Sequence, residues 1–344
     1  MRQFISICVS ALLCATGLQA QQNQLNLYIW SEYIDPEIIT DFEKAHNCKV
    51  TVDLYEDNES MMAKLEGGGT AVYDIVVPSD YIIQPLVKRK LIQPLQHDKI
   101  PNLANVDEQF RSPSFDPGNK YTAPYQWGTV GIFIRKPKDG DIEETWGLVF
   151  DPKKEPGAFV MIDDSRAMIG AALKYLGYSL NSVDKKQLKE ARDLLLEAKG
   201  RSKGFTGGVD GKNRVLARGV TMSIVYNGDA VRGMGEDSET HFFVPKEGGD
   251  IWLDNMCIPS KAPNREMAEK FINYILDAKV GAKLSNFNQY ATPNKAAKPL
   301  IKAEDQKNPA IYPPSDMMKK LEYLNDLGPH NRLYDEIWTY VKSK

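Results

Sequence analysis

Acidic and aromatic side chains follow short apolar runs at several points along this chain. The run 25–29 leads into Trp-Ser-Glu-Tyr at 30–33, and the run 73–78 leads into Ser-Asp-Tyr at 79–81. Later runs end in Asp163-Asp164, in Tyr226-Asn227-Gly228-Asp229 and in Trp252-Leu253-Asp254. Aromatic faces attract cations, and buried carboxylates need a positively charged partner. The pattern therefore predicts a site for a small organic cation.

The elements around these residues indicate how they can meet. Strand patterns at 25–30, 49–54 and 73–77 alternate with two helices, the first of which opens at Asp35-Pro36. This strand–helix–strand order indicates a parallel sheet. In open sheets of this kind, ligands bind beyond the carboxyl ends of the strands. We therefore expect the acidic and aromatic residues to converge on one cleft.

The second half of the chain predicts a further α/β region. A long extended segment at 125–135 is expected to cross into it from the first domain. Its expected elements are strands at 158–162, 221–226, 241–244 and 250–258 and helices at 166–176, 184–199, 264–277 and 279–285. Ile258-Pro259 marks a return crossing, and a helical tail is expected from Ser315. The expected fold is α/β with two domains, for which 344 residues are enough.

The N-terminus has the features of a secretory signal peptide at residues 1–20. Arg2 is its only charge, an apolar core spans 4–13, and Ala20 precedes the expected cut. The protein is therefore expected to be periplasmic. A formal net charge of -3 and the lack of a basic block in the sequence argue against nucleic-acid binding.

The cysteine and histidine patterns predict neither a metal site nor a cofactor. Cys48 and Cys257 remain after the cut, and their apolar, strand-like neighbours favour buried free thiols over a disulfide. The four histidines are scattered, and the sequence has neither a nucleophile elbow nor a histidine-centred triad. We therefore expect no catalytic residues and interpret the chain as a binding protein, not an enzyme.

Ordered motifs along nearly all of the mature chain carry a resemblance to a known family. They are Trp30-Ser31-Glu32-Tyr33, Tyr55 to Met61, Tyr73 to Ser79, Pro124 to Thr129, Tyr226-Asn227-Gly228, Pro245 to Gly249, Trp252-Leu253-Asp254 and Thr292-Pro293-Asn294. With these motifs the chain resembles the periplasmic polyamine-binding proteins of spermidine/putrescine ABC importers. The resemblance implies a monomer that captures putrescine or spermidine and delivers it to a membrane ABC permease.

The resemblance also implies a two-lobed periplasmic binding protein of type II. Each lobe would be a mixed sheet flanked by helices, with the ligand cleft between the lobes. Lobe 1 is expected at 21–131 and 256–303, and lobe 2 at 132–255 and 304–344. Closure of the lobes around the ligand would then be what the permease recognises.

The same motifs imply site residues, position by position. The rings that box the ligand in the family match Trp30, Tyr33, Tyr81, Tyr226, Trp252 and Tyr290. Its amine-pairing carboxylates match Asp164, Asp229 and Asp254, and Ser31, Glu32 and Ser79 match polar contacts. Two departures are Tyr226, where a tryptophan is common, and Ala167, where a glutamate is usual. Asp80 is added to the site because it could replace that lost carboxylate, and the preferred polyamine stays open.

Several of these residues have a purely structural alternative. Asp164 could cap the helix that follows it, Asp229 could cap a helix beginning near Ala230, and Glu32 could lie at the rim. The ligand has alternatives too: agmatine or a basic amino acid would bring a guanidinium or a carboxylate and would need an arginine, for which Arg166 is the candidate, or a helix N-terminus facing the cleft. A ligand-loaded sensor that docks to a membrane receptor is a further alternative.

Overall fold

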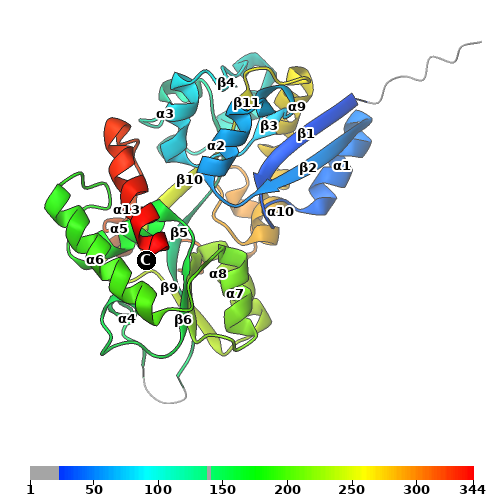
Figure 1. Cartoon of the computed structure of the whole chain (residues 1–344). Coiled ribbons are helices and arrows are strands. Elements are labelled where there is room, and N and C mark those ends of the chain that lie inside the picture. Colours follow the sequence, from blue (N-terminus) through cyan, green and yellow to red (C-terminus); the bar gives the residue numbers. More distant parts are fainter. Residues whose placement is uncertain (1–22, 138–140) are drawn as a thin grey trace, which may run out of the picture.

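The computed structural model describes residues 23–137 and 141–344, which form two lobes (Figure 1). The expected signal peptide at 1–20 lies outside the described residues. The predicted α/β fold with two lobes is confirmed. The assignment of chain segments to lobes, with divisions at 131, 255 and 303, stays a prediction.

The first lobe is built on a parallel sheet, as the strand–helix–strand pattern predicts. Its strands lie in the order β2 (Cys48–Tyr55), β1 (Asn23–Trp30) and β3 (Ile75–Val76). The helices of this lobe are α1 (Pro36–His46), α2 (Asn58–Glu66), α3 (Asp80–Lys88), α9 (Arg265–Ile275) and α10 (Ala278–Asn288). Asp35 caps α1 by accepting from the amide of Glu37, with Pro36 in the first turn as expected. A small antiparallel pair joins β4 (Ile92–Gln93) to β11 (Ile258–Pro259).

The second lobe is built on a mixed seven-stranded sheet. Its main path is β12 (Glu322–Tyr323), β10 (Asp250–Met256), β5 (Ala123–Arg135), β8 (Met222–Tyr226), β6 (Phe159–Ile162) and β7 (Phe205–Thr206), and β9 (Thr240–Phe243) also pairs with β5. The associated helices are α4 (Gly147–Phe150), α5 (Ser165–Tyr175), α6 (Lys185–Arg201), α7 (Gly208–Leu216), α8 (Asn227–Glu236) and α13 (Asn331–Ser343). The short helices α11 (Ala303–Gln306) and α12 (Ser315–Met318) lie in the C-terminal connection.

Two long strands run between the lobes. β5 is buried along nearly its whole length, and it pairs antiparallel with β10 over one half and with β8 over the other. Figure 1 shows β5 and β10 passing through the middle of the molecule, between the two groups of helices. These strands therefore fix the floor of the space between the lobes.

The C-terminal tail differs from the expected helix. A two-residue strand, β12, pairs in parallel with β10 at Asp250 and Ile251 before the long helix α13 begins. This strand forms because it pairs with β10. It could not be predicted from the sequence, because two residues are too few to give a periodic signal. Helix α7 is also absent from the prediction, because glycines at 208 and 211 lower its helix propensity.

The cysteine prediction is confirmed for both thiols of the mature chain. Cys48 and Cys257 are buried and free. Burial raises the pKa of the Cys257 thiol well above its usual value, so it stays protonated. Both residues therefore act as small apolar groups of the two cores in which they lie.

Candidate functional site

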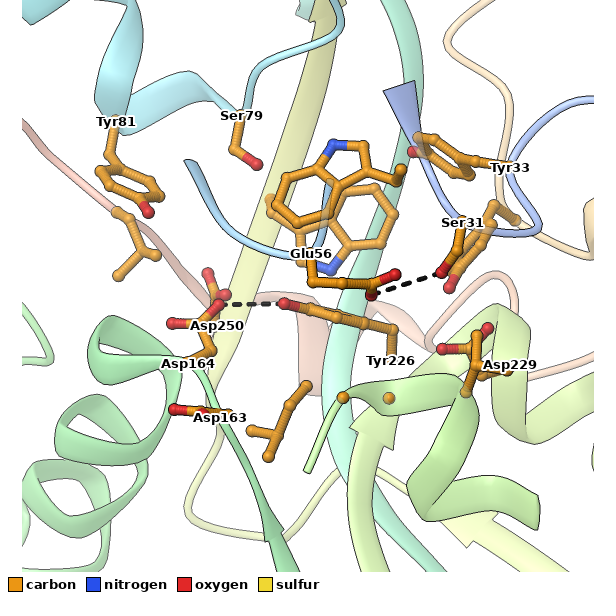
Figure 2. A pocket seen from close by; sticks show the side chains of 18 residues that line it. Ser31, Tyr33, Glu56, Ser79, Tyr81, Asp163, Asp164, Tyr226, Asp229 and Asp250 are labelled. Atoms are coloured by element: carbon orange, nitrogen blue, oxygen red, sulfur yellow. Dashed lines mark hydrogen bonds between the residues drawn. The ribbon is translucent and has the colours of Figure 1, made fainter. Parts of the chain in front are cut away.

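A narrow pocket lies between the lobes, where the carboxyl ends of strands from both lobes face one another (Figure 2). We call it the inner pocket; it has a volume of about 60 Å³. Its lining residues are Trp30, Ser31, Tyr33, Glu56, Ser79, Tyr81, Ile162, Asp163, Asp164, Gly207, Gly208, Val209, Tyr226, Asp229, Asp250, Trp252, Tyr290 and Leu324. Most of the residues predicted for the site are therefore brought together, from strand ends of both lobes and from β10.

A wider outer pocket of about 700 Å³ adjoins the inner one. The two share part of one wall, including Trp30, Ser31, Tyr81 and Asp164. Carboxylates are frequent in the outer lining: besides Asp164 it contains Glu56, Asp57, Glu59, Asp163, Asp210 and Asp335, against Lys342 as its cation. A cation that approaches the inner pocket by this route therefore meets a negatively charged vestibule.

Four aromatic rings form one wall of the inner pocket. The ring of Trp252 on β10 lies 5.2 Å from that of Tyr290, 6.0 Å from that of Tyr226 and 6.5 Å from that of Tyr33, in edge-to-face arrangements. Trp30 also lines the pocket, and its indole N–H donates to the carbonyl of Val77 at 2.9 Å. Such rings cover methylene groups and present faces to a cation.

Two glycines make room for these side chains. A Cβ on Gly128 of β5 would lie 2.5 Å from the indole ring of Trp252, so only glycine lets that ring lie against the strand. A Cβ on Gly208 would lie 2.7 Å from Asp229 Oδ2 and 3.0 Å from the ring of Tyr226. The first turn of α7 can therefore approach the pocket closely because residue 208 is glycine.

Asp164 combines the two roles that the sequence left open. Its Oδ1 accepts from the amide of Ala167 at 2.9 Å and so caps α5, while its Oδ2 accepts from the hydroxyl of Tyr226 at 2.9 Å (Figure 2). Burial raises the pKa of this carboxyl, and the two hydrogen bonds lower it in part. We call this side of the pocket, with Tyr81 and Asp250, the Asp164 end.

Asp229 lies on the opposite side of Tyr226 from Asp164 (Figure 2). It does not cap a helix, because α8 already begins at Asn227. Its Oδ1 instead accepts from the guanidinium of Arg232 at 2.6 Å. Burial raises the pKa of Asp229, and Arg232 and Lys212 lower it. We call this side, with its built-in cations, the Asp229 end.

Arg232 also connects the lobes. From α8 it donates to the carbonyl of Asn288 at 2.7 Å and to Glu32 at 2.9 Å. Glu32 follows β1, has a side chain 47% exposed and does not line the inner pocket. This position agrees with the alternative that Glu32 lies at the rim of the site.

Two other predicted residues also lie outside the inner lining. Asp80 is only 1% exposed, and its Oδ1 accepts from the amide of Tyr81 in the first turn of α3. Asp254 is 5% exposed and accepts from the hydroxyl of Ser79 at 2.7 Å. Burial raises the pKa of Asp254 to about 7, although Ser79 and Tyr33 lower it. Asp254 therefore contacts the pocket through Ser79, whereas Asp80 faces away from it.

Sequence reasoning missed several lining residues, of which Glu56, Asp163 and Asp250 carry a charge. Asp250 lies on β10 two residues before Trp252 and four before Asp254, so all three share a face of the strand. That spacing, already used for Trp252 and Asp254, would have found it. Glu56, whose carboxylate accepts from Ser31 at 3.3 Å, follows β2 in the same way. Gly207, Gly208 and Val209 carry neither a charge nor an aromatic ring, so they had no recognisable signal in the sequence.

Arg166, the residue named for a carboxylate-bearing ligand, does not line the inner pocket. Its guanidinium donates to the carbonyl of Asn325 at 3.1 Å and to Asn181 at 3.0 Å. It lies 4.8 Å from the ring of Tyr334 and 5.5 Å from that of Tyr81. The inner pocket therefore offers no arginine to a carboxylate group at this position.

Across residues 23–137 and 141–344, no group of three or more His, Cys, Asp or Glu side chains is arranged to hold a metal ion. Within the same described ranges, no helix has the length and apolar character needed to cross a membrane.

Comparison with known proteins places this geometry among solute-binding proteins. Residues 37–313 match the family described as bacterial extracellular solute-binding protein. The chain is 31% identical to the spermidine/putrescine-binding periplasmic protein of Escherichia coli, over 100% of this chain and 99% of that protein. It is 30% identical to a putrescine/cadaverine-binding protein of Pseudomonas aeruginosa, over 98% of each. A spermidine/putrescine ABC transporter substrate-binding protein from Streptococcus pneumoniae has a similar structure, with a TM-score of 0.79, 32% identity and coverage of 93% and 99%.

Proposed function

This chain belongs to the family of bacterial extracellular solute-binding proteins, and from that premise we propose that it captures a polyamine such as putrescine or spermidine. The observation that carries the proposal is the inner pocket, where aromatic rings and buried carboxylates from both lobes surround one narrow space. The names of the relatives from E. coli and P. aeruginosa support the same ligand class.

The pocket suits a linear chain of methylene groups that carries ammonium groups. The rings proposed to cover the methylene groups and the cations are Trp30, Tyr33, Tyr81, Tyr226, Trp252 and Tyr290. The carboxylates proposed to pair with ammonium groups are Asp164 and Asp254, with Asp229 already paired to Arg232. Ser31 and Ser79 are polar contacts, whereas Glu32 and Asp80 support the site from outside its lining. An ammonium group loses little by desolvation only where such partners replace water.

The ligand would be bound between the lobes in their closed arrangement. A ligand that contacts both lobes shifts the equilibrium toward closure by its difference in affinity for the two states. The closed form would then deliver the polyamine to a membrane ABC permease. We further propose that the protein is periplasmic through its signal peptide, acts as a monomer, binds no nucleic acid and catalyses no reaction.

Basic amino acids are less well supported as ligands than amines without a carboxylate group. A carboxylate group would have to enter a pocket rich in carboxylates, and Arg166 is held by other residues outside that pocket. A guanidinium such as that of agmatine has no such conflict, so it belongs in the ligand panel. A sensor role would use the same pocket and differ only in the docking partner.

The proposal is tested by a thermal-shift panel on the mature protein with putrescine, cadaverine, spermidine, spermine, agmatine, arginine and lysine. A ligand that binds only the native state stabilises it by RT ln(1 + [L]/Kd), so the polyamines should raise the melting temperature in a concentration-dependent way. Arginine and lysine should leave it unchanged. A protein that no polyamine stabilises would refute the proposal, and stabilisation by lysine or arginine alone would replace it with the amino-acid alternative.

A further inference from the structure

The Asp164 end of the inner pocket holds more negative charge than the protein neutralises. Asp164 and Asp250 both line this end, and Figure 2 shows them side by side below Tyr81. Asp80 lies behind them, close enough that its charge raises the pKa of Asp250. Two carboxylates therefore line this end, and the third, on α3, lies outside the lining but close to Asp250.

Asp250 is the carboxylate that lines this end and lacks a partner. It is 6% exposed, and its Oδ1 is buried with no hydrogen-bond donor among the described residues. Burial, and then the charges of Asp80 and Asp164, raise the pKa of Asp250 well above its usual value. Burying a carboxylate oxygen without a hydrogen-bond donor costs free energy, so such an arrangement is unusual in proteins unless a ligand supplies the donor.

The cation nearest to these carboxylates does not satisfy them. Arg166 lies close enough to lower the pKa values of Asp80, Asp164 and Asp250. Its guanidinium nevertheless donates to oxygens of Asn181, Asn325 and Asn331, at 3.0 to 3.5 Å. One guanidinium against three carboxyl groups leaves Asp250 Oδ1 without a donor at this end.

The chemistry of the missing partner follows from the donors that the carboxylates require. An ammonium group has three N–H donors and one positive charge, whereas a guanidinium is a larger planar fork. Asp164 Oδ2 keeps acceptor capacity beside the hydroxyl of Tyr226, and Asp250 Oδ1 has all of its capacity free. A primary ammonium group can therefore bridge the two carboxylates in a narrow pocket.

We propose that Asp250 determines the ligand specificity of this protein. Asp250 and Asp164 together bind one terminal primary ammonium group of the ligand. This inference rests on the proposed polyamine function. It adds that a terminal ammonium group of the ligand binds at the Asp164 end of the pocket. Asp250 on β10, and not Asp80, would then replace the carboxylate of the glutamate that is usual at position 167, where this chain has alanine. The ligand class is a linear amine with at least one unsubstituted –NH₃⁺ terminus.

The test uses Asp250→Asn in the mature protein, with Glu322→Gln as the matched control. Glu322 lies opposite Asp250 on the paired strand β12, is bound to Lys174, and lines neither pocket. Titration calorimetry with putrescine and spermidine should show at least a tenfold loss of affinity in Asp250→Asn, because a charge-assisted hydrogen bond is lost. The control should stay within about threefold of the wild type.

The melting temperature of the ligand-free protein separates recognition from a structural role. Removing an unpaired buried charge should leave the melting temperature of Asp250→Asn unchanged or raise it. If Asp250→Asn does not fold, Asp250→Ser is measured in its place by the same criteria. Unchanged affinity in a folded variant would overturn the assignment of Asp250, as would a lower melting temperature with an affinity loss no larger than that of the control. A wild type that binds no amine would instead overturn the proposed function.

Discussion

The two ends of the inner pocket differ in how their buried carboxylates are compensated. At the Asp229 end, Arg232 lies 2.6 Å from the carboxylate and Lys212 adds a second positive charge nearby. At the Asp164 end, Tyr226 donates one hydrogen bond to Asp164 and nothing among the described residues donates to Asp250 Oδ1. A carboxylate in a cleft is thus available to a ligand only where the protein has not already neutralised it. The two ends should therefore contribute unequally to binding.

The largest expected difference is between Asp164→Asn and Asp229→Asn. In the first variant the asparagine would still cap α5 but would carry no charge, so affinity for putrescine should fall about 10- to 100-fold. Asp229→Asn should cost less than about fivefold, because Arg232 keeps Glu32 and the carbonyl of Asn288 as partners. Calorimetry on the pair measures the contrast directly. Equal losses in the two variants would break the comparison between the ends.

Trp252→Ala should affect all ligands alike, because the ring lies among Tyr33, Tyr226 and Tyr290 and not at one end. Loss of one cation–π contact of about 0.5–2 kcal/mol, together with loss of apolar cover, should weaken putrescine and spermidine by roughly tenfold. Dissociation constants for the two amines measure this. A loss confined to spermidine would mean that Trp252 belongs to one end of the site.

The pH dependence of binding should reveal the raised pKa of the buried carboxyl of Asp254. Because burial raises the pKa of Asp254 to about 7, the ligand-free protein loses stability as pH rises from about 4 to 7, where the unfolded state is ionised and the folded state is not. An ammonium ligand needs the ionised form, so affinity should fall by up to about tenfold per pH unit below 7. Calorimetry between pH 5.5 and 8.5 tests this, with Asp254→Asn expected to give a flatter profile. A pH-independent wild type would contradict the prediction.

The smallest effect is expected from Ala167→Glu. Ala167 is 3% exposed and lines neither pocket, and its amide already binds Asp164. Because Asp164 and Asp250 already supply charge at this end, a third carboxylate should raise affinity for spermidine by less than about fivefold. A gain of tenfold or more would show that Asp250 does not replace the missing glutamate.

Much of the fold could be predicted from the sequence, because its elements are long and periodic. The parallel strands of the first lobe and the cap at Asp35 follow from local patterns and are present in the structure. The strand β12 and the first turn of α7 could not be predicted, since pairing with β10 fixes one and close approach at Gly208 allows the other.

The candidate site was predictable to the level of which side chains gather, but not of how they are paired. Strand ends place Trp30, Tyr81 and Asp164 around one pocket. The ion pair of Asp229 with Arg232 forms only once α8 has folded and brings the two residues one turn apart. The ion pair of Arg232 with Glu32 forms only once the two lobes lie together. Electrostatic compensation is a property of the folded arrangement, so the difference between the two ends appears only there.

Arg232 has a consequence for how the cleft opens. Its guanidinium holds the end of α10, through Asn288, and the segment after β1, through Glu32. Separation of the lobes on this side requires those bonds to break even when no cargo is inside. If the lobes open and close as proposed above, we expect Arg232 to slow opening even without ligand, and a partner that moves α8 away from α10 to speed release without contacting the ligand.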